Sequence, residues 1–310
     1  MAADVRMRRA RASAGAMIAP EGFILMQMLK TTARKILPQS VADELLARQE
    51  AMHLRKVATV SCDPSALLSG FGADDLAAVF RSPDLDREWV EVETRIRELG
   101  ITANAGGVNP GDRRAVYYLV RHFQPASLLE VGTHIGASTV HLAAAMLDVA
   151  KQHATAPGTM TSVDIMDVND PVRKPWLGFG AASSPRSLTD RLGAGESVTY
   201  VTQPSLEFIK TTPRRFDFCF LDGDHTAKTV YPELAATMRL LNPGGVILLH
   251  DYFPGKKPLW PEARLHSGPW AAVQRLQNEG AKFTVLPLGE LPWPTKLSTN
   301  ITSLALVVRS

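Results

Sequence analysis

The 310-residue chain has few cysteines, no long apolar run and almost no excess of charge of either sign. Its two cysteines, Cys62 and Cys219, are far apart and have no partner histidine or cysteine at ligand spacing, which argues against a cysteine metal site and fits a reducing cytoplasm. No stretch of about 18 apolar residues occurs, so no membrane span is predicted. A net charge of +3 is too small to indicate a nucleic-acid-binding protein, which normally has a concentrated basic face.

The basic residues are nevertheless concentrated near the N-terminus. Residues 1–60 hold ten lysines and arginines against five acids, so the rest of the chain is slightly acidic. The opening VRMRRARASAGAM is rich in arginine, alanine and serine, a composition that overlaps with organellar transit peptides. A frayed basic tail is the favoured interpretation, with about the first 15 residues disordered.

From Met17 to about Leu99, apolar residues recur at helical spacing. The segments FILMQMLKTTARKIL, VADELLARQEAMHL and REWVEVETRIREL carry this pattern, with turn residues between them. A helical N-terminal region covering residues 1–104 is therefore expected. Its methionine stripe is typical of packing against the main domain or against a partner subunit, so a homo-oligomer formed through this region is one expectation.

After Gly106 and Gly107, apolar segments alternate with amphipathic segments, a pattern typical of βαβ units. Residues 105–310 are predicted to form one α/β domain. Its sheet is expected to be doubly wound, mostly parallel and seven-stranded, with an antiparallel closing strand. The predicted strands are residues 127–132, 159–165, 197–203, 216–222, 244–251, 282–288 and 302–309. In such sheets, ligands bind outside the carboxyl ends of the strands.

The stretch LLEVGTHIGAST follows the first of these strands and opens a helix, as a nucleotide-binding loop does. Gly132 and Gly136 allow a tight turn and a close approach of the backbone to a ligand. His134, however, replaces the middle glycine of the dinucleotide fingerprint. Glu130 at the strand end would repel a pyrophosphate, whereas a carboxylate there suits a cationic ligand.

The pattern E-x-G-T-x-x-G-x-S resembles motif I of the class I S-adenosylmethionine-dependent methyltransferases, whose cofactor carries a sulfonium and an amino group. The resemblance implies that the methionine part of S-adenosylmethionine is lined by Glu130, Gly132, Thr133, Gly136 and Ser138. Asp164, at the end of the second strand, matches the acid that accepts both ribose hydroxyls. Gln203, with Thr202, matches the loop that touches the adenine. The alternative is that Glu130 and Asp164 only cap strand ends.

Upstream, GGVNPGDRR looks like the entry to the catechol-type, small-molecule O-methyltransferase branch. There, a segment of the kind N-x-G-D precedes a helix and closes over the methionine end of the cofactor. Asn109, Gly111 and Asp112 match that segment. An ordinary helix N-cap explains Asp112 nearly as well. The chain is also similar to a bacterial family in this branch that is related to macrolide and cephalosporin tailoring enzymes.

Two acids match the metal ligands of catechol-type enzymes. Asp222, which ends the fourth strand, and Asp251, which ends the fifth, take the places of the acids that bind Mg²⁺. The metal-dependent members follow the second acid with Asn or a further acid, whereas this chain has Tyr252. Asp224 or His250 could complete an oxygen-rich site, but imidazole suits magnesium poorly. The resemblance therefore leaves Mg²⁺ open.

His225 lies three residues after Asp222, where catechol-type enzymes carry a lysine base. An imidazole can take the proton of a phenol or sugar hydroxyl as the methyl group arrives, so His225 and Asp222 are the candidate catalytic residues. The alternative makes His225 a residue at a helix start that bonds Asp251 or backbone. Trp260, Trp270 and Trp293 either stack against the acceptor or fill the interior.

The resemblance implies O-methylation of a small-molecule hydroxyl on a phenol, a sugar or a natural-product intermediate. LDGDHT lacks the Pro-Pro pair that follows the fourth strand of nucleic-acid adenine methylases, so DNA is not expected as a substrate. Two alternatives remain. One is a cofactor-binding scaffold or regulatory protein without turnover, and the other is an RNA or protein methyltransferase that docks its substrate through the basic segment.

Overall fold

The computed structural model describes residues 38–102, 105–260, 263, 265–296 and 299–310. The basic tail and the methionine stripe at residues 17–28 lie outside these residues. The chain divides into two compact units, residues 1–46 and 47–310, and the helix α2 (Gln39–Arg55) crosses that boundary. Among the residues described, no helix combines the length and the apolar character needed to cross a membrane.

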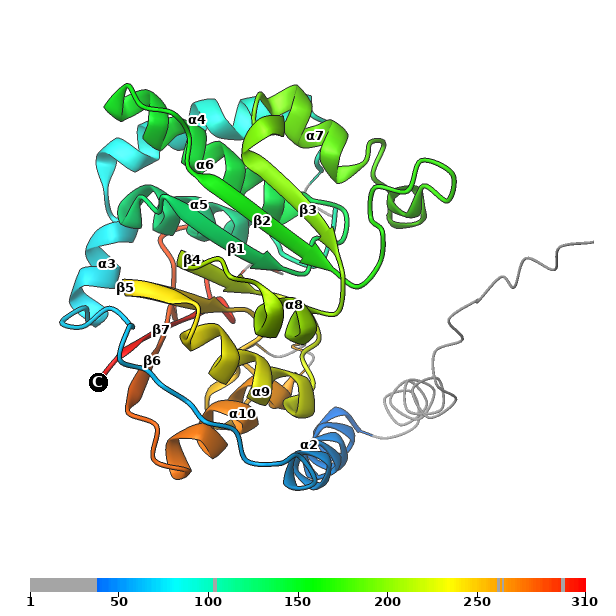
Figure 1. Cartoon of the computed structure of the whole chain (residues 1–310), viewed down its shortest axis with the longest axis vertical. Helices are drawn as coiled ribbons and strands as arrows, with labels where there is room; N and C mark the ends of the chain where they lie inside the picture. The colour runs from blue at the N-terminus through cyan, green and yellow to red at the C-terminus, as the bar shows by residue number, and fades with distance from the viewer. Residues whose placement is uncertain (1–37, 103–104, 261–262, 264, 297–298) are drawn as a thin grey trace, which may run out of the picture. The chain divides into compact units, whose positions relative to one another are not determined.

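Seven strands of the second unit form one sheet in the order β3-β2-β1-β4-β5-β7-β6 (Figure 1). The strands are β1 (Ser127–Val131), β2 (Thr159–Asp164), β3 (Val198–Thr202), β4 (Phe216–Leu221), β5 (Leu241–Leu249), β6 (Phe283–Pro287) and β7 (Ala305–Arg309). The first five run parallel, and β7 is antiparallel to both of its neighbours. The predicted doubly wound sheet with its antiparallel closing strand is confirmed.

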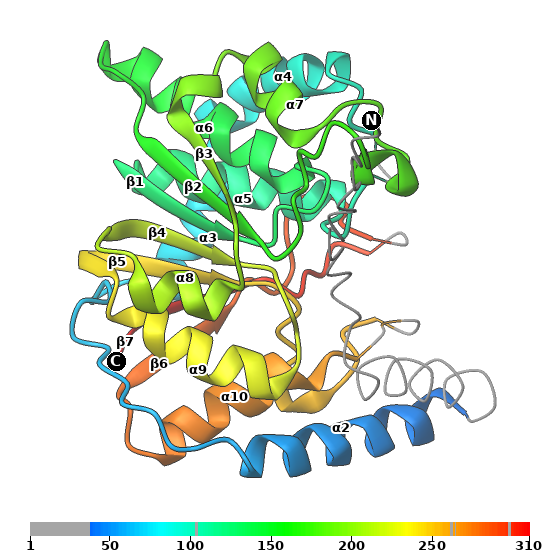
Figure 2. The same cartoon turned by 45° about the vertical axis from the view of Figure 1, so that its right-hand side comes forward.

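Helices cover both faces of this sheet (Figures 1 and 2). One face is covered by α3 (Ala73–Phe80), α4 (Pro83–Glu98), α5 (Pro110–Phe123), α6 (Ala137–His153) and α7 (Pro185–Leu192). The other face is covered by α8 (Ser205–Thr211), α9 (Ala227–Met238) and α10 (Ser267–Asn278). Because β4 is buried on both faces, its sequence FDFCFL reads as a nearly continuous apolar run and not as an alternating one.

The helix α4 packs on α5 and α6 as part of the same unit as the sheet. Trp89 is 7% exposed, and its ring stacks on His141 of α6 at 5.8 Å and lies 5.6 Å from the ring of Tyr117 of α5. The Arg121 guanidinium donates to the Glu88 carboxylate, with Nε 2.8 Å from Oε2. The domain boundary after residue 104 stays a prediction, but α4 and the sheet share one hydrophobic core.

The strand order reverses at β1, which lies between β2 and β4 while the connections wind outward in both directions. In open α/β sheets, the crevice at such a switch point is where ligands bind. Asp222 and Gly132 meet at this point, because the Asp222 amide donates to the Val131 carbonyl at 2.9 Å. The fold therefore brings the glycine loop and the DGDHT segment to one rim of the sheet.

Candidate active site

The loop after β1 is shaped by two glycines with left-handed backbone. Gly132 has φ +96°, and a Cβ placed on it would lie 2.3 Å from the carbonyl oxygen of Asp222. Gly136 has φ +78° at the start of α6, and a Cβ there would lie 2.9 Å from Cβ of Pro185. The loop thus passes too close to β4 and to α7 for any side chain at these positions.

The Glu130 carboxylate points into the interior and is fully buried. It accepts hydrogen bonds from Ser138 Oγ at 2.7 Å, Thr139 Oγ1 at 2.7 Å and Ser162 Oγ at 2.5 Å. Burial raises the pKa of Glu130 to about 7, although the three hydroxyls partly offset this effect. Glu130 and Ser138, both predicted to line the cofactor, lie beneath the loop and bond each other.

Asp164 at the end of β2 is half-buried and lies beside the glycine loop. Its Oδ2 accepts from the amide of His134 and its Oδ1 from the amide of Met166, each at 2.9 Å. The amide of Gln203 donates to the backbone carbonyl of Asp164 at 2.9 Å. The predicted ribose and adenine residues are therefore neighbours, and each Asp164 oxygen keeps one lone pair for a further donor.

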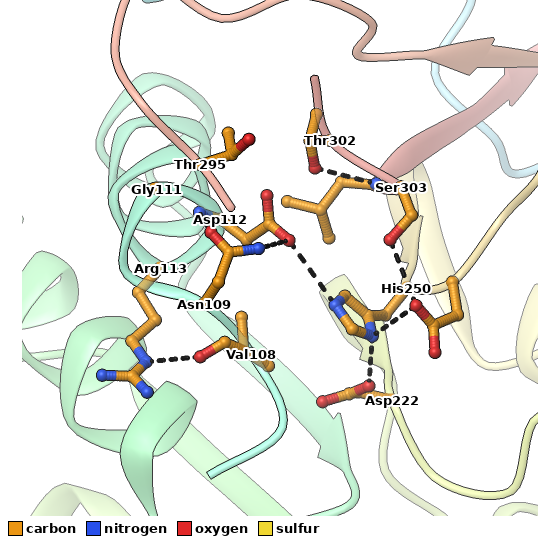
Figure 3. Close-up of polar contacts among 12 residues, drawn as sticks. Val108, Asn109, Gly111, Asp112, Arg113, Asp222, His250, Thr295, Thr302 and Ser303 are labelled. Atoms are coloured by element: carbon orange, nitrogen blue, oxygen red, sulfur yellow. Dashed lines mark hydrogen bonds and ion pairs between the residues drawn. The ribbon is translucent and has the colours of Figure 1, made fainter. Parts of the chain in front are cut away.

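The start of α5 reaches the same rim (Figure 3). Asn109 caps this helix, since its Oδ1 accepts from the Asp112 amide at 3.0 Å, and its Nδ2 donates to Asp112 Oδ2 at 2.5 Å. The Arg113 side chain donates to the Val108 carbonyl at 2.8 Å and holds the preceding loop. Asp112 is 1% exposed, and its Oδ2 lies 3.6 Å from Nε2 of His250. The cap thus connects α5 to the end of β5.

His250 follows β5 and lies between three carboxylates (Figure 3). Its Nδ1 is 2.7 Å from Asp222 Oδ1 and 3.7 Å from Asp251 Oδ1. Burial alone would lower the pKa of His250, but the Asp222 and Asp251 charges and the contact with Asp112 raise it well above its ordinary value. Asp251 has φ +53°, a conformation that is uncommon for a residue other than glycine and frequent at functional sites.

His225 lies between β4 and α9, and its side chain is 24% exposed. Its Nε2 is 3.7 Å from Asp222 Oδ1 and 3.6 Å from Asp251 Oδ2. His266, which precedes α10, lies 3.5 Å from Asp251 Oδ2 through its Nε2. Burial would raise the pKa of Asp251, yet the three neighbouring histidines hold it below its ordinary range. The carboxylates of Asp222 and Asp251 and the imidazoles of His225, His250 and His266 therefore form one cluster of contacts.

The side chains at this rim do not supply the oxygen ligands that magnesium requires. Tyr252, in the place of the third oxygen ligand, is 4% exposed and packs against Trp270 with ring centroids 5.5 Å apart. Asp224 precedes α9, and its Oδ2 accepts from the Thr226 and Thr229 hydroxyls, each at 2.7 Å. Because magnesium prefers an octahedron of oxygens, a site with imidazoles in place of these oxygens does not fit it.

The structure brings the predicted acids and His225 together, but it places one of the predicted tryptophans in the interior. Asp222, His225 and Asp251 meet, whereas Trp293 is buried and donates from Nε1 to the Gly111 carbonyl at 3.0 Å. Sequence reasoning missed His266 and the approach of Asp112 to His250. Nothing local in the sequence signals either contact, because both depend on how separate helices pack.

Residues 129–252 match the sequence model of a family described as a methyltransferase domain. A protein of Mycolicibacterium paratuberculosis named "Putative O-methyltransferase" is 29% identical over 199 residues, which cover 63% of this chain and 80% of that protein. A protein of a Mycobacterium species with the same name is 27% identical over 199 residues, with the same coverage of both chains.

Two solved structures are similar to this chain at low scores. The O-methyltransferase TomG from Streptomyces achromogenes, in complex with SAM, is 17% identical with a TM-score of 0.46, covering 74% of this chain and 91% of that one. An O-methyltransferase from Bacillus cereus, in complex with SAH, is 16% identical with a TM-score of 0.47, covering 77% and 100%. The match to the methyltransferase domain covers more of the candidate site, since residues 129–252 span the glycine loop, Asp222 and Asp251.

Proposed function

We propose that the chain is a class I S-adenosylmethionine-dependent methyltransferase and that it methylates a hydroxyl oxygen of a small molecule. The meeting of the glycine loop with Asp222 and His225 at the ends of β1 and β4 carries this proposal. It puts a candidate proton acceptor beside the loop that would hold the cofactor. The names of the two curated relatives support oxygen as the atom that is methylated.

On the cofactor side, we assign binding to the backbone of Gly132, Thr133 and Gly136. When it is bound there, S-adenosylmethionine supplies an activated methyl group on a positively charged sulfur. Asp164 offers the free lone pairs of its carboxylate to the two ribose hydroxyls, and Gln203 lies next to it. Glu130 and Ser138 position the loop and do not contact the cofactor in this assignment. The hydrogen bond between them holds the start of α6 against β1.

On the acceptor side, Asp222 orients the hydroxyl and His225 removes its proton. An imidazole that gains a proton becomes positively charged. Because Nε2 of His225 lies 3.7 Å from Asp222 and 3.6 Å from Asp251, two carboxylates stabilise that charge. Positioning of the acceptor against the methyl group contributes further, by up to about 7 to 11 kcal/mol in well-oriented systems.

The test is turnover of S-adenosylmethionine with a panel of catechols, phenols and sugar alcohols, followed by mass spectrometry of the products. We expect a methylated product in equal amount to S-adenosylhomocysteine. His225→Ala should lower kcat by about a hundredfold or more and leave cofactor affinity unchanged, because it removes only the proton acceptor. His153→Ala, which changes an exposed histidine near the end of α6, serves as the control.

Two outcomes would contradict the proposal. Unchanged kcat in His225→Ala on a true substrate would remove the base assignment. Tight cofactor binding with no turnover on any acceptor would favour a scaffold, and methylation of RNA or protein alone would favour the macromolecular alternative.

We also infer a reducing compartment such as the cytoplasm, and the two thiols support this. Cys62 and Cys219 are free cysteines, and Cys219 is fully buried in β4. Burial, with a smaller effect of Asp63, raises the pKa of Cys62 to about 11, so this thiol is unreactive near neutral pH.

A further inference from the structure

The helix α9 begins directly after His225, and its first amide bonds a side chain from a distant helix. Thr226 takes the N-cap position, but its hydroxyl donates to Asp224 Oδ2 at 2.7 Å and does not cap α9. Ala227 is fully buried, so its amide is shielded from solvent. Glu50 of α2 accepts from this amide, with Oε2 2.8 Å from the nitrogen. A carboxylate is favourable there, because it faces the positive end of the helix dipole.

The end of α2 is tied to the helices on this face of the sheet. Ala47, Glu50 and Leu54 recur at helical spacing, are each buried, and belong to the same unit as the sheet. The Arg275 guanidinium of α10 donates to the Leu54 carbonyl at 2.5 Å and to the Val57 carbonyl at 2.9 Å. The end of a helix leaves such carbonyls free, so this contact completes α2 and holds it on α10.

The backbone of His225 is confined by α10 as well. A Cβ placed on Gly268, in the first turn of α10, would overlap the His225 carbonyl oxygen and lie 2.6 Å from the Ala227 nitrogen. The His225 ring has weaker restraints, because its Nε2 lies 3.7 Å from Asp222 and 3.6 Å from Asp251, both longer than a hydrogen bond. The position of the ring therefore depends on the backbone that α2 and α10 hold.

We propose that Glu50 is a positioning residue for methyl transfer: it fixes the first turn of α9 and with it the backbone from which His225 reaches the acceptor. The inference rests on the proposed function, in which His225 removes the acceptor's proton. A displacement of about 1 Å at a reacting group can lower the rate by about a hundredfold. Part of the N-terminal region thus belongs to the catalytic apparatus, although Glu50 and Ala227 are 177 residues apart in sequence.

The experiment compares Glu50→Ala with Glu50→Gln in kcat and in S-adenosylmethionine affinity. We expect Glu50→Ala to lower kcat by about ten- to a hundredfold without a change in cofactor affinity, because the cofactor residues lie at the ends of β1 and β2. Glu50→Gln keeps an oxygen that accepts from Ala227, so its kcat should stay within about threefold of the wild type. Met52→Ala, exposed on the same helix, should behave as the wild type.

These readouts distinguish positioning from a purely structural role. A residue that only stabilises the fold changes the fraction of chains that bind cofactor, not kcat per cofactor-binding chain. Where circular dichroism shows that Glu50→Ala does not fold, Glu50→Leu fills the same space without an acceptor and takes its place. Equal loss of kcat in the glutamine variant and in the variant without an acceptor would overturn the inference.

Hydrogen exchange reports on the anchor without turnover. The amide of Ala227 should exchange at least about tenfold faster in Glu50→Ala than in the wild type, and Glu50→Gln should retain its protection. Wild-type exchange or wild-type kcat in Glu50→Ala would overturn the inference alone. A wild-type chain that methylates no acceptor would instead contradict the proposed function, whatever the exchange of Ala227.

Discussion

At the scale of single residues, Asp164 provides the most direct test of the cofactor assignment. Both of its oxygens already accept backbone amides, yet each keeps a lone pair, and the side chain is half-buried at the rim. Asp164→Asn removes the charge and half of the acceptor capacity. Hydrogen bonds to a charged group contribute about 1.5 to 3 kcal/mol, so we expect S-adenosylmethionine affinity to fall by about ten- to a hundredfold in isothermal titration.

Asp167→Asn is the matched control for this change. Asp167 lies three residues further along, is exposed, and accepts the amide of Asn169 at 3.1 Å in a similar local turn. Its variant should bind the cofactor as the wild type does. Equal affinity in both variants would mean that Asp164 only caps the end of β2.

Glu130 predicts a pH dependence of stability. Its pKa is raised from 4.5 to about 7 by burial, so the folded state holds the proton more tightly than the unfolded state. The stabilisation is fully present below pH 4.5 and is lost as the pH rises through about 7. This group alone should lower the free energy of unfolding by up to about 3 kcal/mol over that window, as measured by urea denaturation at several pH values.

Glu130→Gln separates this effect from those of other acids. The amide keeps an oxygen that can accept from Thr139 and Ser162, presents its N–H to Ser138 and does not ionise, so the decline between pH 4.5 and about 7 should flatten. Glu207→Gln, on the exposed face of α8, should leave the profile as it is. A profile of Glu130→Gln that overlays the wild type would refute the assignment.

At the scale of elements, the junction of β1 and β4 depends on a close backbone approach. Gly132→Ala introduces a Cβ 2.3 Å from the Asp222 carbonyl oxygen at a left-handed φ of +96°. Left-handed backbone costs a residue with a Cβ about 1 to 2 kcal/mol, and overpacking adds about 1 to 3 kcal/mol. We expect a destabilisation of about 2 to 5 kcal/mol in chemical denaturation, together with weaker cofactor binding.

Gly193→Ala isolates the two contributions. Gly193 ends α7 with φ +86°, but a Cβ there would meet nothing within 4 Å. This variant should show only the smaller backbone cost. If both variants lost the same stability, the approach of β1 to β4 would have no special role.

The strands could be predicted from sequence because their signals are local. β1 and β4 are apolar runs that end at Gly132 and Asp222, and burial of both faces produces that pattern. The short helices α3 and α7 were not predicted, since eight residues give little periodicity. The left-handed turn at Asp251 was not predictable either, because it is a strained conformation that the surrounding structure imposes.

At the scale of the whole molecule, the limit of prediction was the convergence of distant segments. Asp222 and His225 are near neighbours in sequence, so their proximity could be anticipated. Asp112 and His250 meet only because the first turn of α5 lies near the end of β5, and His266 directly precedes α10. The charge balance of the site depends on these long-range contacts, so the sequence could indicate acids at the rim but not the full set of imidazoles around them.

The N-terminal helix α4 gives a prediction for the unit as a whole. Trp89 fills the space between α5 and α6, with its ring on His141 and Tyr117, so it belongs to the core of residues 47–310. Trp89→Ala should destabilise the sheet domain by about 3 to 5 kcal/mol and lower the melting temperature of its single transition. Val90→Ala, on the exposed side of the same helix, should change it little. If Trp89→Ala instead melted in two steps, with the sheet unfolding at the wild-type temperature, the helices before residue 105 would be a separate domain and the boundary expected from the sequence would hold.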